Sequence, residues 1–455
     1  MVLAKVLDKF AKSSPVAVMA RATMERALDA PALDALFREH ADSQYEKELL
    51  FSSLVDLMAL VVCGVHPSVR RAYEAMREEL PVTLSALYAK LNHVEVGTSQ
   101  ALVAASAGRL RPVIDALGGA RDPWLPGYRV KALDGNHIAA TERRLEVLRD
   151  CAAGPLPGQS LVVLEPETGL AIQMVGCEDG HAQERSLLGP VMEAVEPNDV
   201  YIADRNFCTL GFLFGVAAHG GLFVVRQHAQ LPVVSEGTLR RHGRTDSGEL
   251  FEQPVTLRLD GESLRIRMIV LRLDTPTRDG DTEMAILTNL EANVASATVV
   301  ADLYRRRWSV ESLFARVERN LQSELAALGY PGAAVFTFAV ALVASNVFAV
   351  VRAALVAAQR NHPDDKIARM PLSDLAIVEE VRTVHRGMNI VLDDKHWHRF
   401  QTMPAAQLAK ALLCWTQHVD WGRLRKSVRG PKVTRKRTRF LDTPHVSTAR
   451  LLGRA

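Results

Sequence analysis

The sequence is poor in residues that cross-link a chain or bind zinc. Its five cysteines, Cys63, Cys151, Cys177, Cys208 and Cys414, lie far apart, and none forms a Cys-x-x-Cys pair. This pattern argues against a disulfide framework and against a thiolate zinc site, and it is typical of a reducing compartment such as the cytosol. We therefore expect the cysteines to be small buried side chains.

The sequence also has almost no excess of charge of one sign. The 55 Lys and Arg residues and 52 Asp and Glu residues give a net charge of only +3, which excludes a uniformly basic nucleic-acid-binding coat but not a locally basic surface. The first residues, MVLAKVLDKFAKSS, contain no long apolar run, so we expect no signal peptide. With 455 residues, 48% of them hydrophobic, the chain is long enough to bury a large core.

One apolar stretch, residues 333–351, approaches the length of a membrane span. It is rich in alanine and contains Thr337, Ser345 and Asn346. We therefore predict a buried core helix here and no membrane association.

Periodicity divides the chain into helical and strand-rich regions. Apolar residues three and four apart predict helices before Trp124, either a DNA-end-binding module or a plain helical bundle. Short apolar strands then alternate with helices, and from Gln227 onward the pattern is β throughout before helices return. We predict an α/β protein with five regions: a helical N-terminal region (1–125), a first α/β part (126–226), a β insertion (227–290), a second α/β part (291–375) and a helical C-terminal region with a basic tail (376–455).

Two carboxylates follow apolar strands. Asp134 comes directly after VKAL, and Asp204 comes directly after VYIA. Loops at strand ends stay open to ligands, and a carboxylate there is costly if buried without a partner, a cost that a bound cation would offset. The alternative for each residue is an ordinary turn or helix-capping aspartate.

A third acid lies in a helical pattern, YRRRWSVE. Arg307 and Glu311 are four residues apart and share a helix face, with Tyr304 three residues before Arg307. The alternative is a surface ion pair of little consequence. Apolar residues of the same segment are expected to anchor the helix, namely Trp308, Val310 and Leu313.

Three carboxylates can hold two divalent metal ions for phosphoryl transfer, one activating the nucleophile and one stabilising the leaving oxygen. Mg²⁺ suits oxygen ligands and keeps exchangeable waters. His137 lies close to Asp134 in sequence and is a candidate substrate contact, with a simple loop histidine as the alternative.

Together these residues resemble the DDE transposases of the insertion-sequence-four family, the bacterial cut-and-paste type. The resemblance rests on LDGNHI with Asp134, on YIADRNF with Asp204, and on the Tyr-x2-Arg-x3-Glu spacing of Tyr304, Arg307 and Glu311. A β insertion between the second Asp and the Glu matches the family as well. The resemblance covers residues from about 125 to 355.

The resemblance implies an RNase H-like catalytic domain interrupted by a mainly β insertion and flanked by helical regions. It implies that Asp134, Asp204 and Glu311 are catalytic ligands of two Mg²⁺ ions, with Mn²⁺ able to substitute. Tyr304 and Arg307 would hold a phosphate near the cleaved strand. Two further DNA contacts are expected at Arg205 and Arg319.

The sequence departs from the family pattern at two points. Seven residues after Glu311, where the family has Lys, stands Glu318, so Arg316 or Arg319 would have to replace that phosphate contact. The β insertion contains no Trp to receive a flipped base, which leaves a hairpin intermediate unsupported; Phe251 is a weak substitute for stacking.

The implied activity is DNA transposition in the bacterial cytoplasm, in association with the nucleoid. The protein would bind terminal inverted repeats and target double-stranded DNA, pair two ends as a homodimer, cleave, and join strands. One alternative is a catalytically inactive DNA-binding protein derived from a transposase, which Glu318 motivates. Another is an RNase H-like nuclease that cuts without strand transfer.

The small net charge hides a basic C-terminal tail. Residues 421–455 contain eleven Lys and Arg residues and one acid, Asp442, so the rest of the chain is net acidic. A charge run is often only a solvated tail, but beside a phosphoryl-transfer site it favours contact with the DNA backbone. The candidate contacts in this tail are Lys426, Arg435, Lys436 and Arg437.

Overall fold

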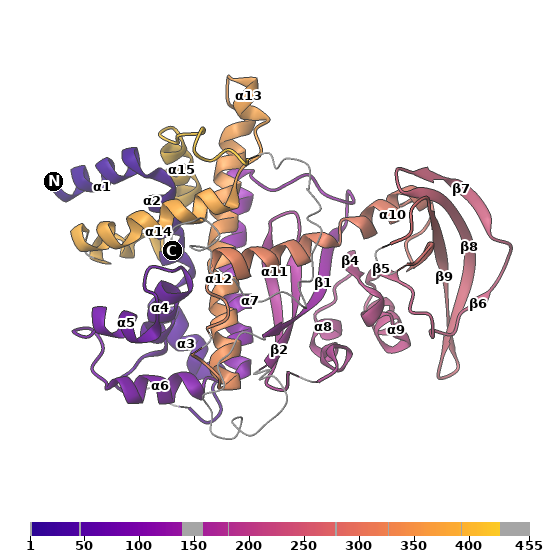
Figure 1. Ribbon diagram of the computed structural model, residues 1–455, viewed down its shortest axis with the longest axis horizontal. Coiled ribbons are helices and arrows are strands. Elements are labelled where there is room, and N and C mark those ends of the chain that lie inside the picture. Colours follow the sequence, from indigo (N-terminus) through magenta and orange to yellow (C-terminus); the bar gives the residue numbers. More distant parts are fainter. Residues whose placement is uncertain are drawn as a thin grey trace, which may run out of the picture.

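The computed structural model describes residues 2–44, 47–138, 158–180, 182–277, 280–325, 327–392 and 394–427. Figure 1 shows helices from both ends of the chain gathered around one long helix, with a sheet extending away from them. The mixed α/β architecture with helical flanks that the sequence predicts is confirmed.

The helices occur before, within and after the strand-rich part of the chain. They are α1 (Val2–Ser13), α2 (Pro15–Ala27), α3 (Ala30–His40), α4 (Phe51–Val62), α5 (Val69–Ala75), α6 (Leu84–Asn92), α7 (Val96–Leu117), α8 (Gly189–Glu193), α9 (Leu210–Ala218), α10 (Ala297–Arg305), α11 (Trp308–Asn320), α12 (Pro331–Arg360), α13 (Asp365–Ala368), α14 (Asp374–Val391) and α15 (Ala405–Thr416). Short 3₁₀ turns are η2 (Glu184–Leu187), η3 (Arg205–Phe207), η4 (Asp394–His396) and η5 (His398–Phe400).

The strands of the described residues form one ten-stranded mixed sheet in the order β3-β2-β1-β4-β5-β10-β9-β8-β6, with β7 paired to β8. β1, β4 and β5 are parallel to one another, whereas β2, β3 and β10 pair antiparallel to their neighbours. The strands are β1 (Arg129–Ile138), β2 (Gly158–Glu165), β3 (Leu170–Cys177), β4 (Asp199–Ala203), β5 (Leu222–Arg226), β6 (Val234–Ser235), β7 (Arg240–Thr245), β8 (Gly248–Leu259), β9 (Glu262–Leu273) and β10 (Glu283–Thr288).

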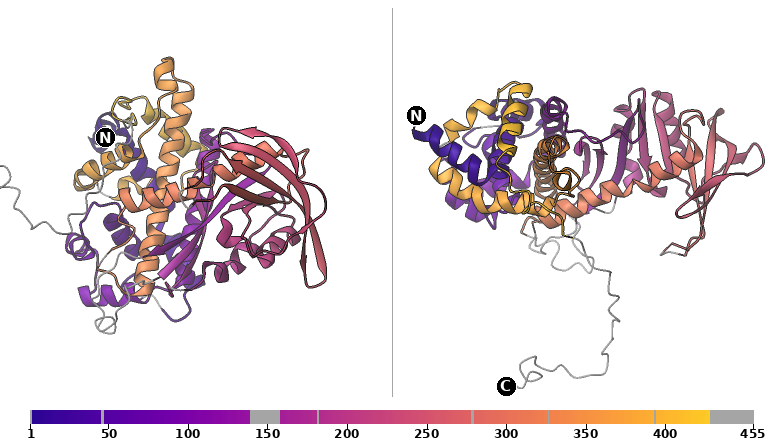
Figure 2. Two further views of the ribbon diagram at one scale, coloured as in Figure 1. Left: turned by 45° about the vertical axis from the view of Figure 1, so that its right-hand side comes forward. Right: turned by 90° about the horizontal axis from the view of Figure 1, so that it is seen from above.

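Alternate residues of the central strands pack on opposite faces of the sheet. Ala132 on β1 and Val162 on β2 belong to the core that includes α7, α11 and α12. Leu133, which follows Ala132, and Leu161, which precedes Val162, belong to the core beneath α8 and α9. Figures 1 and 2 show α10 and α11 running in succession along one face of the sheet. The even-numbered residues of β1 therefore face α11.

Two sequence-based expectations about local structure need correction. β1 does not end at Asp134 but continues to Ile138, because it keeps its antiparallel partner β2 after its pairing with β4 ends at Ala132. The helical pattern of YRRRWSVE does not form one continuous helix, since α10 ends at Arg305 and α11 begins at Trp308. The spacing of Tyr304, Arg307 and Glu311 therefore spans a helix junction.

The apolar helix α12 is the central element of the helical part. By length and composition alone it could cross a membrane, but 83% of its most apolar window is buried inside the described structure. The prediction of a core helix for residues 333–351 is confirmed. Its polar residue Asn346 is fully buried, and its side-chain amide pairs with the edge strand β3: Oδ1 accepts from the N–H of Ala171 at 2.8 Å, and Nδ2 donates to the Ala171 carbonyl at 3.0 Å. Nδ2 also donates to Ser106 of α7 at 3.0 Å.

We predict that Asn346→Ala lowers the free energy of unfolding by about 2–4 kcal/mol, because it leaves a buried N–H and a buried C=O of β3 without partners. Denaturant unfolding followed by circular dichroism measures the change. Asn361→Ala is the matched control, since the exposed Asn361 only donates to the carbonyl of Ala357 within its own helix end; there we expect a change within about 0.5 kcal/mol. Equal losses in both variants would contradict the role given to Asn346.

Candidate active site

The strand register places the two predicted aspartates side by side. Ala132 of β1 pairs in parallel with Ile202 of β4. Asp134 and Asp204 each follow two residues later, so they stand next to each other. Ile202 in turn pairs with Val224 of β5, which puts Arg226 in the same row. The carboxyl ends of adjacent parallel strands are the edge at which α/β sheets present reactive groups. Two acids and one base thus meet at this edge, although they are far apart in sequence.

The junction between α10 and α11 brings the third acid to this row. Arg307, at the junction, has a side chain only 8% exposed. One of its guanidinium nitrogens lies 3.0 Å from Asp134 Oδ2, and the other lies 2.7 Å from Glu311 Oε1. Tyr304, at the end of α10, is buried, and its ring centre is 5.9 Å from the Arg307 guanidinium. The structure therefore brings Asp134, Tyr304, Arg307 and Glu311 together.

Burial and like charge both disfavour the ionised form of Asp134. Burial raises the pKa of Asp134 to about 7, against the lowering effects of Arg307 and of the Gly135 N–H, with Asp204 and Glu311 raising it further. These mutual effects show that the three acids lie within electrostatic reach of one another. Burial also raises the pKa of the Tyr304 hydroxyl, which lies near Arg307, Arg226 and Asp204.

Arg307 is the main counter-charge of this cluster. Burial works against its charged form, but Tyr304, Asp134 and Glu311 together raise its pKa above the ordinary value. Glu311 lies in the first turn of α11, where the helix dipole also favours a negative charge. The guanidinium therefore occupies the space between two of the three carboxylates.

Asp204 is held by the turn that follows β4. It caps η3, and its Oδ1 accepts a hydrogen bond of 2.7 Å from the N–H of Asn206. Both Asp204 and Asn206 are half-buried, whereas the neighbouring Arg205 is exposed. Arg205 thus stands at the rim of the site with its side chain open to solvent.

The donor set is compatible with a hard divalent cation, which prefers carboxylate oxygens. The raised pKa of Asp134 reflects a burial cost that a nearby cation would reduce. Within the described ranges, however, no group of three or more His, Cys, Asp and Glu side chains is arranged to hold a metal ion. Arg307 instead contacts two of the acids.

Two other residues that the sequence singled out lie away from the three acids. Arg319 and Glu318 are exposed near the end of α11, about 12 Å along the helix from Glu311 at 1.5 Å per residue. Trp308 is 61% exposed, so it does not anchor α11 as expected; the buried Val310 and Leu313 do. Its ring lies beside the Arg307 guanidinium, which is 5.4 Å from the ring centre.

In the C-terminal region, Lys426 is exposed, and its backbone N–H donates to the carbonyl of Pro371. Arg435, Lys436 and Arg437 lie outside the described residues.

Two residues of the site were not predicted from the sequence. Arg226 ends β5 in the row of the aspartates, and its guanidinium is 2.5 Å from Asp281 Oδ2. A polar residue directly after the apolar run LFVV was the available signal, since both aspartates follow such runs. Glu184 of η2 accepts a hydrogen bond from the Asn206 amide and lies 3.8 Å from His137 Nε2.

Glycine at position 135 leaves the space that Glu184 occupies. A Cβ atom at Gly135 would lie 2.1 Å from Glu184 Oε1. The glycine of LDGNHI therefore permits Glu184 to link the segment after Asp134 with the segment after Asp204. Nothing in the local sequence around Glu184 indicates this contact, because it joins three separate segments.

We predict that Asp134→Asn changes how stability depends on pH in metal-free buffer. The folded pKa of Asp134 is about 7 and the unfolded value is near 4, so the unfolded chain releases this proton first as pH rises. Protonated Asp134 therefore contributes to the unfolding free energy of the wild type below pH 4, and this contribution is lost as pH rises to about 7. The variant lacks this loss, so its unfolding free energy relative to wild type should rise by on the order of 2–4 kcal/mol across that interval.

Chemical unfolding at several pH values measures this difference. Asp122→Asn, at an exposed residue, is the control and should keep the wild-type pH dependence. A constant difference between Asp134→Asn and wild type from pH 4 to 7 would count against the burial cost assigned to Asp134.

Two comparisons with known proteins point to transposases. Residues 157–346 match the family model described as the transposase DDE domain. The matched range includes Asp204, Tyr304, Arg307 and Glu311, and it begins after Asp134. A Sinorhizobium fredii (strain NBRC 101917 / NGR234) protein described as "Putative transposase y4zB" is 29% identical over 131 residues, which are 28% of this chain and 36% of that protein. The chain thus matches about a third of the length of this relative, and its residues 157–346 are similar to a transposase DDE domain.

Proposed function

We propose that the protein is a DNA transposase that cleaves the ends of a mobile element and transfers its strands to target DNA by metal-dependent phosphoryl transfer. The observation that carries the proposal is the convergence of Asp134, Asp204 and Glu311 from β1, from the end of β4 and from α11. These acids come together in a chain whose residues 157–346 match the transposase DDE domain.

The sheet topology supports an RNase H-like catalytic domain. β1 to β3 form an antiparallel group, and β4 and β5 are added parallel to β1 on its other side, giving the order β3-β2-β1-β4-β5. β6 to β10 come between β5 and α10 in sequence and extend the same sheet beyond β5. This arrangement supports a β insertion between the segments that carry Asp204 and Glu311.

We propose that Asp134, Asp204 and Glu311 hold two Mg²⁺ ions, with Mn²⁺ as a substitute, after Arg307 has left its position between Asp134 and Glu311. Bound ions of this kind activate a water or a 3′-hydroxyl and stabilise the leaving oxygen. Arg307, which contacts two of the acids, offsets their negative charge in the metal-free protein. Tyr304 and Arg226 place a hydroxyl and a further cation beside the same acids, where a phosphate of the cleaved strand would lie.

The partners that this chemistry implies are the terminal inverted repeats and a target duplex, paired by two copies of the chain. Arg205 at the rim is proposed to contact the DNA backbone, and Arg319 is proposed as a more distant contact. A transposase acts on chromosomal DNA, so we place the protein in the bacterial cytoplasm, associated with the nucleoid. The burial of α12 supports a protein without a membrane span.

We predict that Asp204→Ala abolishes Mg²⁺-dependent cleavage of a labelled transposon end, with a loss of about three orders of magnitude or more, while end binding stays within about twofold. Denaturing gels measure cleavage, and gel shifts measure binding. Asp260→Asn, in the exposed turn between β8 and β9, is the control and should cleave like wild type, because Asn tolerates the positive φ of this position. Cleavage by Asp204→Ala at the wild-type rate would contradict the catalytic role proposed for Asp204. If the wild-type protein binds ends without cutting them, it is better described as a catalytically inactive DNA-binding protein derived from a transposase. If it cuts DNA without forming a joined product, it is better described as an RNase H-like nuclease without strand transfer.

A second prediction concerns the basic tail. Truncation after Ser427 preserves the buried Leu424 and the hydrogen bond of the Lys426 backbone to Pro371, and it removes eight Lys and Arg residues. We expect weaker DNA binding and a shallower dependence of log affinity on log salt, with the slope reduced by about 0.9 for each DNA phosphate that the tail neutralises. Binding isotherms at several salt concentrations measure the slope. An unchanged slope would assign the tail a role outside DNA binding.

A further inference from the structure

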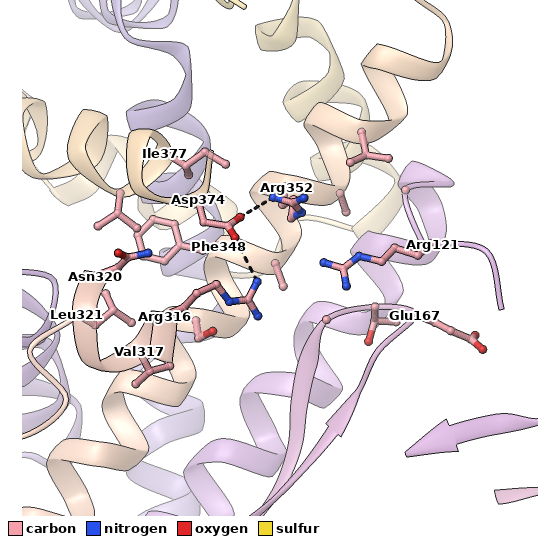
Figure 3. A pocket seen from close by; sticks show the side chains of 18 residues that line it. Arg121, Glu167, Arg316, Val317, Asn320, Leu321, Phe348, Arg352, Asp374 and Ile377 are labelled. Carbon is pink, nitrogen blue, oxygen red and sulfur yellow. Dashed lines mark hydrogen bonds and ion pairs between the residues drawn. The ribbon is translucent and has the colours of Figure 1, made fainter. Parts of the chain in front are cut away.

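A second cationic site lies beside α11, away from the three acids. A cavity of about 60 Å³ opens between the loop after α7, the turn from β2 to β3, and the helices α11, α12 and α14. Three arginines on separate elements line it: Arg121 after α7, Arg316 on α11 and Arg352 on α12. Figure 3 shows their guanidinium groups directed into the same hollow, with Arg121 entering from the side opposite Arg316.

The backbone around the cavity holds Arg121 in place. α7 ends at Leu117 and is capped by Gly118, whose φ is 59°. A Cβ at Gly119 would lie 2.3 Å from the carbonyl oxygen of Ala353 on α12. The chain therefore turns closely against α12 before it reaches Arg121. The Arg121 N–H then donates to the Glu167 carbonyl at 2.9 Å, and its guanidinium donates to the Pro166 carbonyl at 3.3 Å.

Positive charge in the cavity exceeds the negative charge that faces it. Asp374, the first residue of α14, accepts from Arg352 at 2.5 Å and from Arg316 at 3.4 Å. One carboxylate thus serves two guanidinium groups, and Arg121 remains as a third cation. Glu167 also lines the cavity, but Figure 3 shows its carboxylate directed away from the arginines.

Two further features show that this charge is incompletely compensated. Loss of solvent around the guanidinium and then the charges of Arg352 and Arg316 lower the pKa of Arg121 to about 10, although the residue as a whole is exposed. Nε of Arg316 and Nε of Arg352 are buried and have no hydrogen-bond partner among the described residues. Buried donors without acceptors are costly, and an anion in the cavity would supply acceptors for them.

We propose that this cavity is a binding site for one tetrahedral oxyanion, a phosphate group, held by Arg121, Arg316 and Arg352. Guanidinium groups are planar forks that bind phosphate oxygens through paired N–H donors, and three of them surround the cavity. The volume is several times the roughly 10–15 Å³ needed for one water. The phosphate comes either from a nucleic-acid backbone or from a free phosphate compound, and both share this chemistry.

The position of the site gives the phosphate a structural consequence. α11 carries Glu311 in its first turn and Arg316 further along the same helix, beside α14. A phosphate bound to Arg316 and Arg352 would tie α11 to α12 and to the loop after α7. The proposal does not depend on the transposase function, because it rests on a separate cavity and separate residues.

Phosphate binding by the full chain provides the test. Thermal unfolding midpoints are measured with increasing sodium phosphate and, at equal ionic strength, sodium chloride. For wild type we expect a saturable rise with phosphate beyond that with chloride. Arg121→Gln should weaken phosphate binding at least tenfold, because it removes one of the three cations. Arg70→Gln, at an exposed arginine of α5 paired with Glu74, should bind like wild type.

Asp374→Asn provides a change of opposite sign. Removal of this carboxylate leaves Arg316 and Arg352 without their shared anion, so the variant should be less stable alone but should gain more from phosphate than wild type. A second arm replaces phosphate by a short mixed-sequence duplex. Competition between duplex and phosphate identifies the DNA backbone as the source, and duplex binding unaffected by Arg121→Gln identifies a free phosphate compound. Equal phosphate responses of Arg121→Gln and Arg70→Gln would overturn the site.

Discussion

The double contact of Arg307 with Asp134 and Glu311 is the interaction on which the rest of the site depends. It joins β1 to the start of α11 through one buried guanidinium, 3.0 Å from one carboxylate and 2.7 Å from the other. Burial, and to a smaller extent the charges of Asp204 and Glu311, raise the pKa of Asp134, and Arg307 opposes this rise. The break between α10 and α11 lies at Arg307, between Arg305 and Trp308.

The sheet and α12 supply the frame against which this contact is made. Parallel pairing of β1 with β4 and of β4 with β5 sets Asp134, Asp204 and Arg226 in one row. α12 covers the same sheet from the helical side, and its buried Asn346 binds the backbone of β3. Both faces of the sheet pack against hydrophobic cores, so the carboxyl ends of β1, β4 and β5 are held in fixed positions. This suits a site whose chemistry requires fixed charges.

Much of the local structure could be predicted from sequence. Periodicity predicted the helices before Trp124, the alternation of strands and helices after it, and the buried helix at residues 333–351. The predictions failed where tertiary contacts override local pattern. β1 continues past Asp134 because β2 still pairs with it, and Trp308 is exposed although its neighbours are buried. A regular helical spacing across Tyr304, Arg307 and Glu311 concealed the junction, since intervals of three and four look alike in one helix and across two.

The sequence by itself determined which residues carry the candidate chemistry: the two aspartates after apolar runs and the Tyr, Arg and Glu of one motif. Those are properties of residue type and spacing, which a linear pattern retains. Only the tertiary structure decided that Arg226 stands in line with the aspartates, that Glu184 fills the space left by Gly135, and that arginines from three elements share one cavity. These relations arise from strand register and helix packing between segments distant in sequence, and no local pattern encodes them.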